Sequence, residues 1–357
     1  MNALVVGDFK DLERDQVVKA AARADATAVF CPSVPKALTR MRTGHDRPLC
    51  VLVSGDTDVK QLVDGIRDEA ELFSVPVLVL LARLSSDAYR AAYLAGADDV
   101  VIAADIGGFT RRLANLHQHS SSGRPAATLG RAVVVSQSEE SRRRLGRTLR
   151  HVGFEVSYAS SMDEVIRGAQ DGQKPAFAVV SGVAPIGTVA SGTGLGNVAT
   201  FAGIPTLFLT TEDAQLAAQA DDQIADVTGK LLFFADEQAK ADFKDRRVSA
   251  RKLYSSICSF REVGGLQPTY GVTHNLSREG MYVRTLDAPR PQSSLWIELH
   301  APVNGTPIHL RARAVWQRLP GSGRGVLPPG FGLRIDTEQC PPRDLEALAS
   351  GYEALGA

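Results

Sequence analysis

Residues 48–55 read PLCVLVSG, and residues 175–182 repeat this pattern as PAFAVVSG. In both segments a proline precedes a run of apolar residues that ends in Ser-Gly. Such a run, bounded by turn residues, is typical of a strand buried on both faces of a parallel sheet. In both copies a second proline, Pro76 or Pro205, opens the next apolar run. The recurrence predicts that residues 1–235 contain one α/β plan twice.

Around the first segment, short β-branched runs alternate with amphipathic stretches that fit helices. The expected strands are Leu4–Val6, Ala28–Cys31, Cys50–Val53, Val75–Leu81 and Asp99–Ile102. The expected helices lie near Leu12–Ala24, Val34–Thr43, Val59–Ala70, Asp87–Ala95 and Phe109–His117. Strands that alternate with helices in this way indicate a parallel sheet with helices on both faces.

The second copy follows the same order, after a linker-like stretch at His117–Leu129. The expected strands are Ala132–Val135, Glu155–Ala159, Phe177–Val180, Thr206–Leu209 and Lys230–Phe234. The expected helices are Ser138–His151, Met162–Asp171 and Asp213–Ala220. A long loop, which contains a glycine-rich run at 192–197, is expected after the third strand.

After residue 236 a charged segment leads into runs with two-residue alternation and closely spaced Gly/Pro turns, a pattern that favours a small antiparallel barrel. The expected strands are Leu253–Phe260, Tyr270–Leu276, Met281–Thr285, Ser294–His300, Ile308–Leu319 and Phe331–Ile335. A short helix is expected at Asp344–Leu355. The sequence thus predicts a multidomain chain with two α/β domains, 1–117 and 130–236, followed by an antiparallel β-barrel at 237–357.

Composition narrows the classes of function. The 40 Lys and Arg residues balance 40 Asp and Glu residues, which argues against a protein that coats nucleic acid or membrane by bulk charge. The longest apolar run, VPVLVLLA at 75–82, is far shorter than the roughly 20 residues of a membrane span. The four cysteines are scattered without CxxC spacing, so we expect no disulfide framework and no metal site. We expect a cytoplasmic protein without a secretory signal.

The strand and helix order of both copies resembles the flavodoxin-like receiver domain of response regulators. That resemblance implies an aspartate phosphoacceptor at the end of the third strand and an acidic pair after the first. Here Ser54 and Ser181 occupy the acceptor positions, and the acidic pairs become Gly7-Asp8 and Ser136-Gln137. A serine cannot form the acyl phosphate of an aspartate, and without clustered carboxylates Mg²⁺ would bind poorly. We therefore expect two degenerate receiver-like domains that serve packing or protein contacts.

A run of arginines precedes the first barrel strand, where the sequence reads RRVSAR at 246–251. A guanidinium can grip phosphate oxygens or a guanine edge with two hydrogen bonds, and it can also stack on a base. Further on, the sequence reads NLSREG at 275–280, which presents an amide and a hydroxyl two residues apart. These groups predict a compact ligand that combines purine bases with phosphates.

The two elements together resemble the PilZ domain, whose signature is RxxxR followed by [D/N]xSxxG. Similarity extends over roughly 245–336. PilZ domains are receptors for the bacterial second messenger cyclic di-GMP. The resemblance implies that Arg247 and Arg251 contact guanine and phosphate, with Arg246 either substituting for one of them or adding a contact. It also implies that the barrel side of the site is formed by Asn275, Ser277 and Gly280.

The sequence as a whole predicts a non-enzymatic signalling effector that binds cyclic di-GMP, uses no cofactor and signals to a protein partner. We expect no DNA binding and no membrane insertion, and the family context suggests control of motility. Two alternatives stay open: a ligand-independent protein–protein scaffold, and an atypically phosphorylated response regulator. The sequence does not decide between a homodimer and packing of the two copies within one chain. Glu279 departs from the small residues common in the family, and an inward-pointing carboxylate would weaken binding of an anion.

Overall fold

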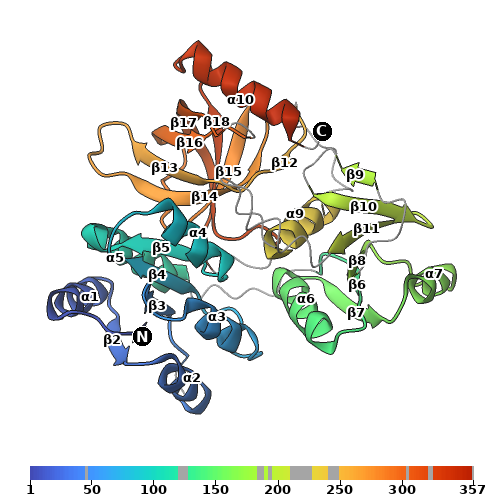
Figure 1. The fold of residues 1–357 in the computed structure, drawn as a ribbon, viewed down its shortest axis with the longest axis horizontal. Helices are drawn as coiled ribbons and strands as arrows, with labels where there is room; N and C mark the ends of the chain where they lie inside the picture. The colour runs from blue at the N-terminus through green and yellow to red at the C-terminus, as the bar shows by residue number, and fades with distance from the viewer. Residues whose placement is uncertain are drawn as a thin grey trace.

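The structure is a computed structural model that describes residues 1–44, 47–119, 128–182, 189–191, 195–209, 227–239, 249–302, 305–320 and 325–355. Two α/β domains and a C-terminal antiparallel barrel surround a common centre (Figure 1). This is the predicted fold class. The arrangement of the three units matters for function, because the barrel contacts both of the other domains.

The first domain is built on a five-stranded sheet of order β2-β1-β3-β4-β5, and every neighbouring pair is parallel. The strands are β1 (Asn2–Val6), β2 (Thr27–Cys31), β3 (Cys50–Ser54), β4 (Val77–Leu81) and β5 (Asp99–Ile102). The helices are α1 (Asp11–Arg23), α2 (Val34–Thr43), α3 (Val59–Arg67), α4 (Ser86–Leu94) and α5 (Ile106–His119). This strand order is the flavodoxin-like one. The helix α5 covers the start of the stretch expected as a linker.

Two separate cores lie on the faces of this sheet. The helices α2, α3 and α4 bury residues against one face, and α1 and α5 bury residues against the other. The burial of β3 explains the apolar run in PLCVLVSG. Its residues Cys50 to Val53 are all fully buried, and their side chains alternate between the two cores. A strand covered on both faces cannot tolerate polar side chains on either one.

The second domain departs from the predicted plan in its last part. Its sheet has the order β7-β6-β8-β11-β10-β9, parallel as far as β11 and antiparallel beyond it. The strands are β6 (Arg131–Val135), β7 (Glu155–Ala159), β8 (Phe177–Ser181), β9 (Val189–Ser191), β10 (Gly196–Phe201) and β11 (Ile204–Leu209). The helices are α6 (Glu139–Val152), α7 (Met162–Gln170) and α9 (Val227–Ala239). The prediction of an unbroken loop after β8 was therefore wrong, since β9 and β10 lie within it. The helix expected at Asp213–Ala220 lies outside the described residues.

The predicted strand Lys230–Phe234 is also wrong, because these residues belong to the helix α9. Residues 231–236 of this helix are all buried, so α9 is covered on every side. One side packs on the second domain, where Phe234 meets Phe177 at a ring-centroid distance of 5.4 Å. The other side meets the barrel, where Phe233 lies 6.0 Å from the ring of His274. A continuous apolar run fits a buried strand and a buried helix equally well, which explains the error.

The barrel is a closed ring of six antiparallel strands in the order β14-β13-β16-β17-β18-β15, with β15 pairing back to β14. The strands are β12 (Lys252–Leu253), β13 (Ile257–Glu262), β14 (Thr269–Leu276), β15 (Gly280–Arg284), β16 (Ser294–His300), β17 (Pro307–Arg318) and β18 (Gly330–Ile335), followed by the helix α10 (Pro342–Ala354). The single strand expected at Leu253–Phe260 is divided into β12 and β13. Between them, Thr273 of β14 hydrogen-bonds Tyr254 and Ser256, which bends the chain away from a regular ladder.

A buried polar network joins the barrel to the first domain. Arg112 of α5 is 3% exposed and Asp99 of β5 is fully buried, and the Arg112 Nε donates to the Asp99 Oδ2 at 2.9 Å. The same carboxylate oxygen accepts hydrogen bonds from barrel residues that follow β15, namely Leu286 N–H at 2.7 Å and Thr285 Oγ1 at 3.2 Å. Asp287 lies 3.5 Å from the Arg112 Nη1 and adds a second carboxylate.

Charge is balanced within this network. Burial would lower the pKa of the Arg112 guanidinium, but Asp99 and Asp287 raise it above its ordinary value, so Arg112 is charged. Burial raises the pKa of Asp287, and Arg112 and Arg111 oppose that shift. Arg111 contributes directly, because its Nε donates to both Asp287 oxygens at 2.9 and 3.1 Å. Removing one partner of such a buried pair typically costs about 3–5 kcal/mol.

Apolar contacts surround the network. Leu286 is 3% exposed and packs into the core formed by α1 and α5, although it belongs to the barrel chain segment. Val272 of β14 packs into the opposite core, beside Tyr89 and Tyr93 of α4. The guanidinium of Arg284 lies 5.5 Å from the ring centroid of Tyr93. Barrel residues therefore contribute to both cores of the first domain.

The contact between the two α/β domains is more exposed. Arg147 of α6 donates to the carbonyl oxygens of Arg67 and Asp68 at the end of α3. Arg143 lies 3.5 Å from the Asp68 carboxylate, and both side chains are about half exposed. An exposed ion pair of this kind contributes at most about 1 kcal/mol. The two domains pack within one chain, but through a weaker contact than the one that fixes the barrel.

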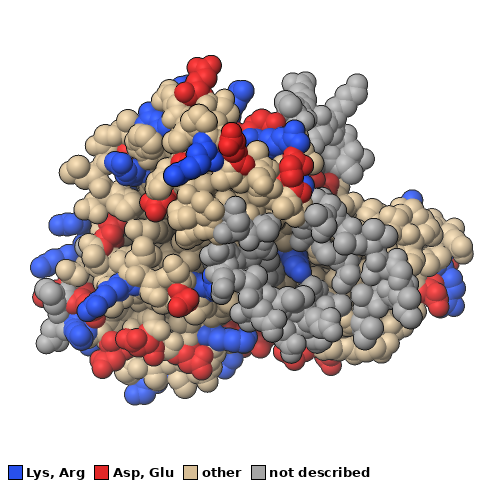
Figure 2. All heavy atoms as spheres, turned by 45° about the horizontal axis from the view of Figure 1, so that its top comes forward, with Lys and Arg blue, Asp and Glu red and all other residues tan. Residues whose placement is uncertain are grey.

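The outer surface carries no single-sign charge field on the face shown in Figure 2, where basic and acidic side chains are intermixed. This agrees with the balanced composition of the chain. None of the helices in the described ranges has the length and apolarity needed to cross a bilayer.

The interface predicts that Leu286→Ala destabilises the protein. Removing a buried leucine side chain costs the transfer free energy plus a cavity term, so we expect the free energy of unfolding to fall by about 2–4 kcal/mol. Urea denaturation followed by circular dichroism measures this change. Leu266→Ala is the matched control, since Leu266 is 93% exposed on the same barrel and should change stability by less than about 0.5 kcal/mol. Equal effects of the two substitutions would contradict the interface.

Candidate functional site

The phosphoacceptor positions of both α/β domains carry serine in place of the aspartate that a receiver phosphorylates. Ser54 ends β3 and Ser181 ends β8, which are the positions expected for a phosphoacceptor. Gly7 follows β1, and a Cβ added there would lie 2.5 Å from the Thr57 Oγ1 and 3.0 Å from the Ser54 Cβ. The Thr57 hydroxyl and the Ser54 side chain therefore occupy the space beside Gly7 where a functional receiver would place a carboxylate. Within the described ranges, no cluster of three or more acidic, His or Cys side chains could hold a metal ion.

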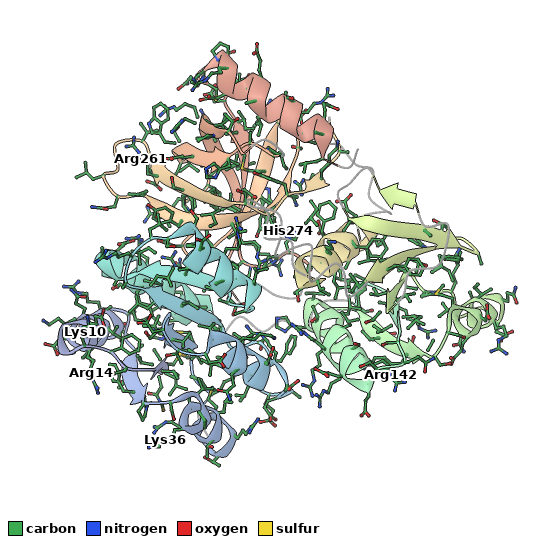
Figure 3. All side chains as sticks on the ribbon, in the orientation of Figure 1. Lys10, Arg14, Lys36, Arg142, Arg261 and His274 are labelled. Atoms are coloured by element: carbon green, nitrogen blue, oxygen red, sulfur yellow. The ribbon has the colours of Figure 1, made fainter. Side chains whose placement is uncertain are left out.

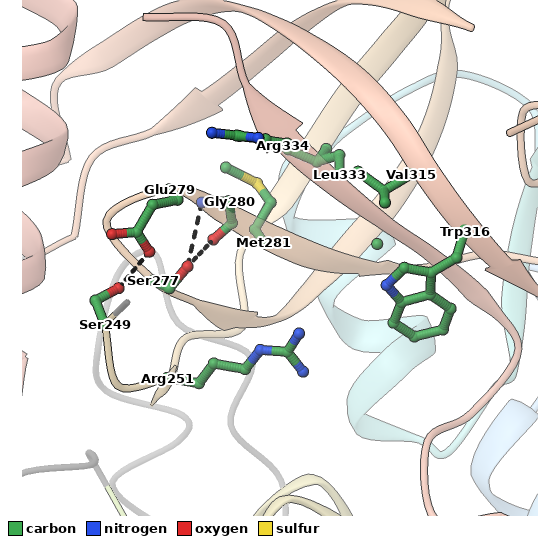
Figure 4. A pocket seen from close by; sticks show the side chains of 11 residues that line it. Ser249, Arg251, Ser277, Glu279, Gly280, Met281, Val315, Trp316, Leu333 and Arg334 are labelled. Atoms are coloured by element: carbon green, nitrogen blue, oxygen red, sulfur yellow. Dashed lines mark hydrogen bonds between the residues drawn. The ribbon is translucent and has the colours of Figure 1, made fainter. Parts of the chain in front are cut away.

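The barrel carries a pocket of about 330 Å³ on its outer surface. Its lining residues come from the chain entering the barrel, from the turn between β14 and β15, and from β17 and β18: Ser249, Arg251, Ser277, Glu279, Gly280, Met281, Val315, Trp316, Gly332, Leu333 and Arg334. Figure 4 shows these side chains around the opening. The pocket thus brings together the ends of the two sequence elements that suggested a ligand site.

A tight turn forms the floor of this pocket. The Ser277 N–H donates to the Gly280 carbonyl at 2.8 Å, and the Gly280 N–H donates back to the Ser277 Oγ at 3.1 Å. A Cβ at Gly280 would lie 2.1 Å from the Leu333 carbonyl oxygen of β18. The glycine is required because the backbone of β18 passes so close to it. Its role is therefore to let two strands meet at the pocket floor.

A short contact fixes the incoming chain to this turn. The Ser249 Oγ donates to the Glu279 carboxylate at 2.5 Å and accepts a hydrogen bond from the Arg278 N–H at 3.1 Å. Ser249 lies two residues before Arg251, so this contact holds the chain next to Arg251 at the turn. Figure 4 shows the Arg251 side chain extending from this point across the pocket towards Trp316. Arg246 and Arg247 lie outside the described residues.

Asn275 lies beside the pocket and not in its lining. Its Cα pairs with that of Tyr282 across β14 and β15, so both side chains share the outer face of the barrel. The Asn275 side chain is almost fully buried, and neither amide atom has a hydrogen-bond partner among the residues that the structure describes. Burying an amide without hydrogen-bond partners costs free energy. The Asn275 amide can therefore still donate and accept hydrogen bonds next to the site, and such bonds would remove that cost.

An aromatic stack forms one wall, and reasoning from the sequence missed it. The ring of Trp316 stacks on that of Tyr282 at a centroid distance of 5.1 Å and an interplanar angle of 20°. Burial raises the pKa of the Tyr282 phenol above its ordinary value, and the neutral hydroxyl donates to the Pro328 carbonyl at 2.6 Å. Tyr282 in turn lies 6.3 Å from His274, which faces α9 (Figure 3). The pocket wall is thus linked by ring contacts to the helix that joins the second domain.

The sequence does contain the two residues that shape this wall, Trp316 and Gly332, but they lie on different strands. Gly332 is the third residue of β18, and a Cβ there would lie 2.3 Å from the Trp316 Nε1. The glycine therefore leaves room for the indole to lie flat on the neighbouring strand. Only the pairing of β17 with β18 places Trp316 and Gly332 side by side. Arg334 reaches the pocket through the same pairing.

Comparison with protein-family models matches residues 245–350 to the family described as PilZ domain. The matched segment covers the closed barrel and most of α10. Residues 245–350 therefore form a PilZ domain, preceded by two α/β domains of receiver-like architecture. A search of curated protein sequences found no match.

Solved structures similar to parts of the chain include three of particular relevance. A response regulator in red light signaling of R. palustris is 19% identical, with 36% of this chain and 100% of that chain covered and a TM-score of 0.29. The PilZ domain of CeSA from a cellulose-synthesizing bacterium is 17% identical, with 30% and 100% covered and a TM-score of 0.24. An atypical orphan response regulator is 19% identical, with 33% and 96% covered and a TM-score of 0.29. The receiver-like description of the first domain rests on its strand order.

The altered receiver positions predict that the protein does not accept a phosphoryl group. After incubation with acetyl phosphate and Mg²⁺, we expect no mass increase in intact-mass spectrometry, because the carboxylate nucleophile and its metal ligands are missing. The control is the double variant Ser54→Ala/Ser181→Ala under the same conditions. A phosphorylated species in the native protein that disappears in this variant would show that the serines react.

The turn at the pocket floor predicts that Gly280→Ala disturbs the barrel itself. The added methyl collides with the β18 backbone, so we expect the unfolding midpoint to fall by several degrees, equivalent to a loss of about 1–3 kcal/mol. Thermal denaturation measures this. Gly168→Ala in α7 is the control: nothing lies within 4 Å of its added Cβ, and alanine favours a helix. An unchanged midpoint for Gly280→Ala would refute the close strand contact.

Proposed function

Since residues 245–350 form a PilZ domain, we propose that this chain is a cyclic di-GMP-binding signalling effector without catalytic activity. The observation that carries the proposal is the pocket that joins Ser249 and Arg251 to the Ser277–Gly280 turn. A guanidinium, a hydroxyl and a flat aromatic wall suit a ligand that combines anionic phosphates with purine bases. Arg246 and Arg247 belong to the same short segment and would supply further contacts.

We propose that the ligand acts on the arrangement of the domains. The buried network around Arg112 fixes the barrel to the first domain, whereas the second domain contacts the first through exposed arginines. The chain leaves the second domain through α9 and reaches the pocket at Ser249, so ligand contacts made by residues 240–251 would act on the second domain. Such a change draws its free energy from contacts made only in the bound state.

The output in this proposal is a protein partner, since neither receiver-like domain carries phosphorylation chemistry. The barrel covers α4, β5 and α5 of the first domain, so a partner or a second copy of the chain would use other faces. We place the protein in the cytoplasm, and we expect no DNA binding. Control of motility is the output that the PilZ resemblance suggests.

Isothermal titration calorimetry with cyclic di-GMP tests this function. We expect saturable binding by the native protein, weakened about tenfold or more in Arg251→Ala and in Arg247→Ala, because a charge-assisted hydrogen bond is lost. Affinity should also fall as the salt concentration rises. Arg261→Ala is the matched control, because Arg261 lies in β13, outside the pocket lining, and among the described residues it bonds only the Gly265 carbonyl. No heat with the native protein would favour a ligand-independent scaffold.

A further inference from the structure

Two arginines lie directly opposite each other at the edge of the barrel pocket. Arg313 of β17 and Arg334 of β18 are register partners, and Arg334 lines the pocket. Both side chains are exposed. Directly opposed residues on antiparallel strands share a face with Cβ atoms about 4.5–5.5 Å apart. The barrel therefore places two positive charges side by side on its outer surface.

Within the described part of the chain, no acidic side chain pairs with either of these arginines. Among the residues that the structure describes, neither guanidinium has an ion pair or a hydrogen bond. The neighbouring arginines are different: Arg311 bonds the Gln339 side chain and lies over the Trp296 ring, and Arg278 pairs with Glu353. Like charges placed directly opposite destabilise a sheet. The pair therefore has a cost in the ligand-free protein that a bound anion would remove.

The position of the pair relative to Arg251 is the second observation. Gly280 is the register partner of Arg334 on the other side, and it places no side chain next to Arg334, because the β18 backbone occupies the space that a Cβ would fill. Figure 4 shows Arg251 and Arg334 on opposite sides of the Ser277–Gly280 turn. The Glu279 carboxylate also lines the pocket, but it accepts a hydrogen bond from the Ser249 hydroxyl.

We infer that Arg313 and Arg334 form a second phosphate-binding subsite of the pocket, separate from the one served by Arg251. The inference rests on the proposed function and goes further, because it assigns a place to each end of the ligand. A cyclic dinucleotide carries its two phosphates on opposite sides of the ring. One phosphate is held by Arg251, and the other lies against the β17–β18 pair. Two adjacent planar guanidinium groups present the parallel donors that a phosphate accepts best.

The test is the double variant Arg313→Gln/Arg334→Gln, which keeps length and polarity but removes both charges. We expect its affinity for cyclic di-GMP in calorimetry to fall about tenfold or more, with a weaker salt dependence. In the absence of ligand, its unfolding midpoint should stay unchanged or rise, because the repulsion is gone. That combination separates a lost binding site from a damaged fold. Arg261→Gln is the control and should bind as the native protein does.

A second measurement does not depend on the identity of the nucleotide. Inorganic pyrophosphate at low ionic strength should raise the unfolding midpoint of the native protein and of Arg261→Gln, and raise it less in the double variant. One outcome would refute the subsite while the proposed function stands. In that outcome the native protein binds cyclic di-GMP, Arg251→Ala weakens this binding, and the double variant leaves it unchanged. If cyclic di-GMP gives no heat but the pyrophosphate effect depends on the pair, the proposed function fails and the anion site remains. If the double variant binds cyclic di-GMP as tightly as the native protein and shows the same midpoint shift with pyrophosphate, the inference is wrong.

Discussion

The arrangement of this molecule depends on one buried charge network, in which Arg112 holds the carboxylates of Asp99 and Asp287. Arg112 and Asp99 pair within the first domain, whereas Asp287 of the barrel finds its ion-pair partners, Arg112 and Arg111, in the first domain. The cost of burying these groups is offset by ion pairs and hydrogen bonds that come from both units. Leu286 adds an apolar anchor beside it. The barrel is thereby held in one orientation on the first domain.

This constraint gives the strand β15 a special position. Its first residue, Gly280, belongs to the pocket floor, and the residue after its last one, Thr285, donates a hydrogen bond to Asp99. Pocket and network therefore lie at the two ends of one short strand that is paired on both sides. The aromatic contacts from Trp316 to His274 lead from the same pocket towards α9. The pocket is therefore linked to the first domain through β15 and to α9 through the ring contacts.

The sequence predicts correctly those strands whose burial leaves a clear pattern of apolar residues along the chain. The strands Asp99–Ile102 and Ser294–His300 were placed at their observed bounds, because a doubly covered parallel strand and an alternating barrel strand each leave a clear pattern. The prediction failed at Lys230–Phe234, where burial on all sides removes any periodicity. At the site, the linear elements contain Arg251 and Ser277, but Trp316 and Arg334 come from distant strands. Their place in the pocket depends on the pairing of β15, β17 and β18, which a single sequence does not display.

The burial of α9 bears on how such a chain evolves. The helix gives Phe234 to the second domain and Phe233 to the barrel, and it continues to Ala239, across the position where the sequence suggests one domain ends and the next begins. A recombination event that exchanged only the C-terminal barrel at that position would cut the helix and leave an apolar surface without its cover. The barrel can therefore be inherited as an exchangeable module only together with α9 and the face of the first domain that it covers.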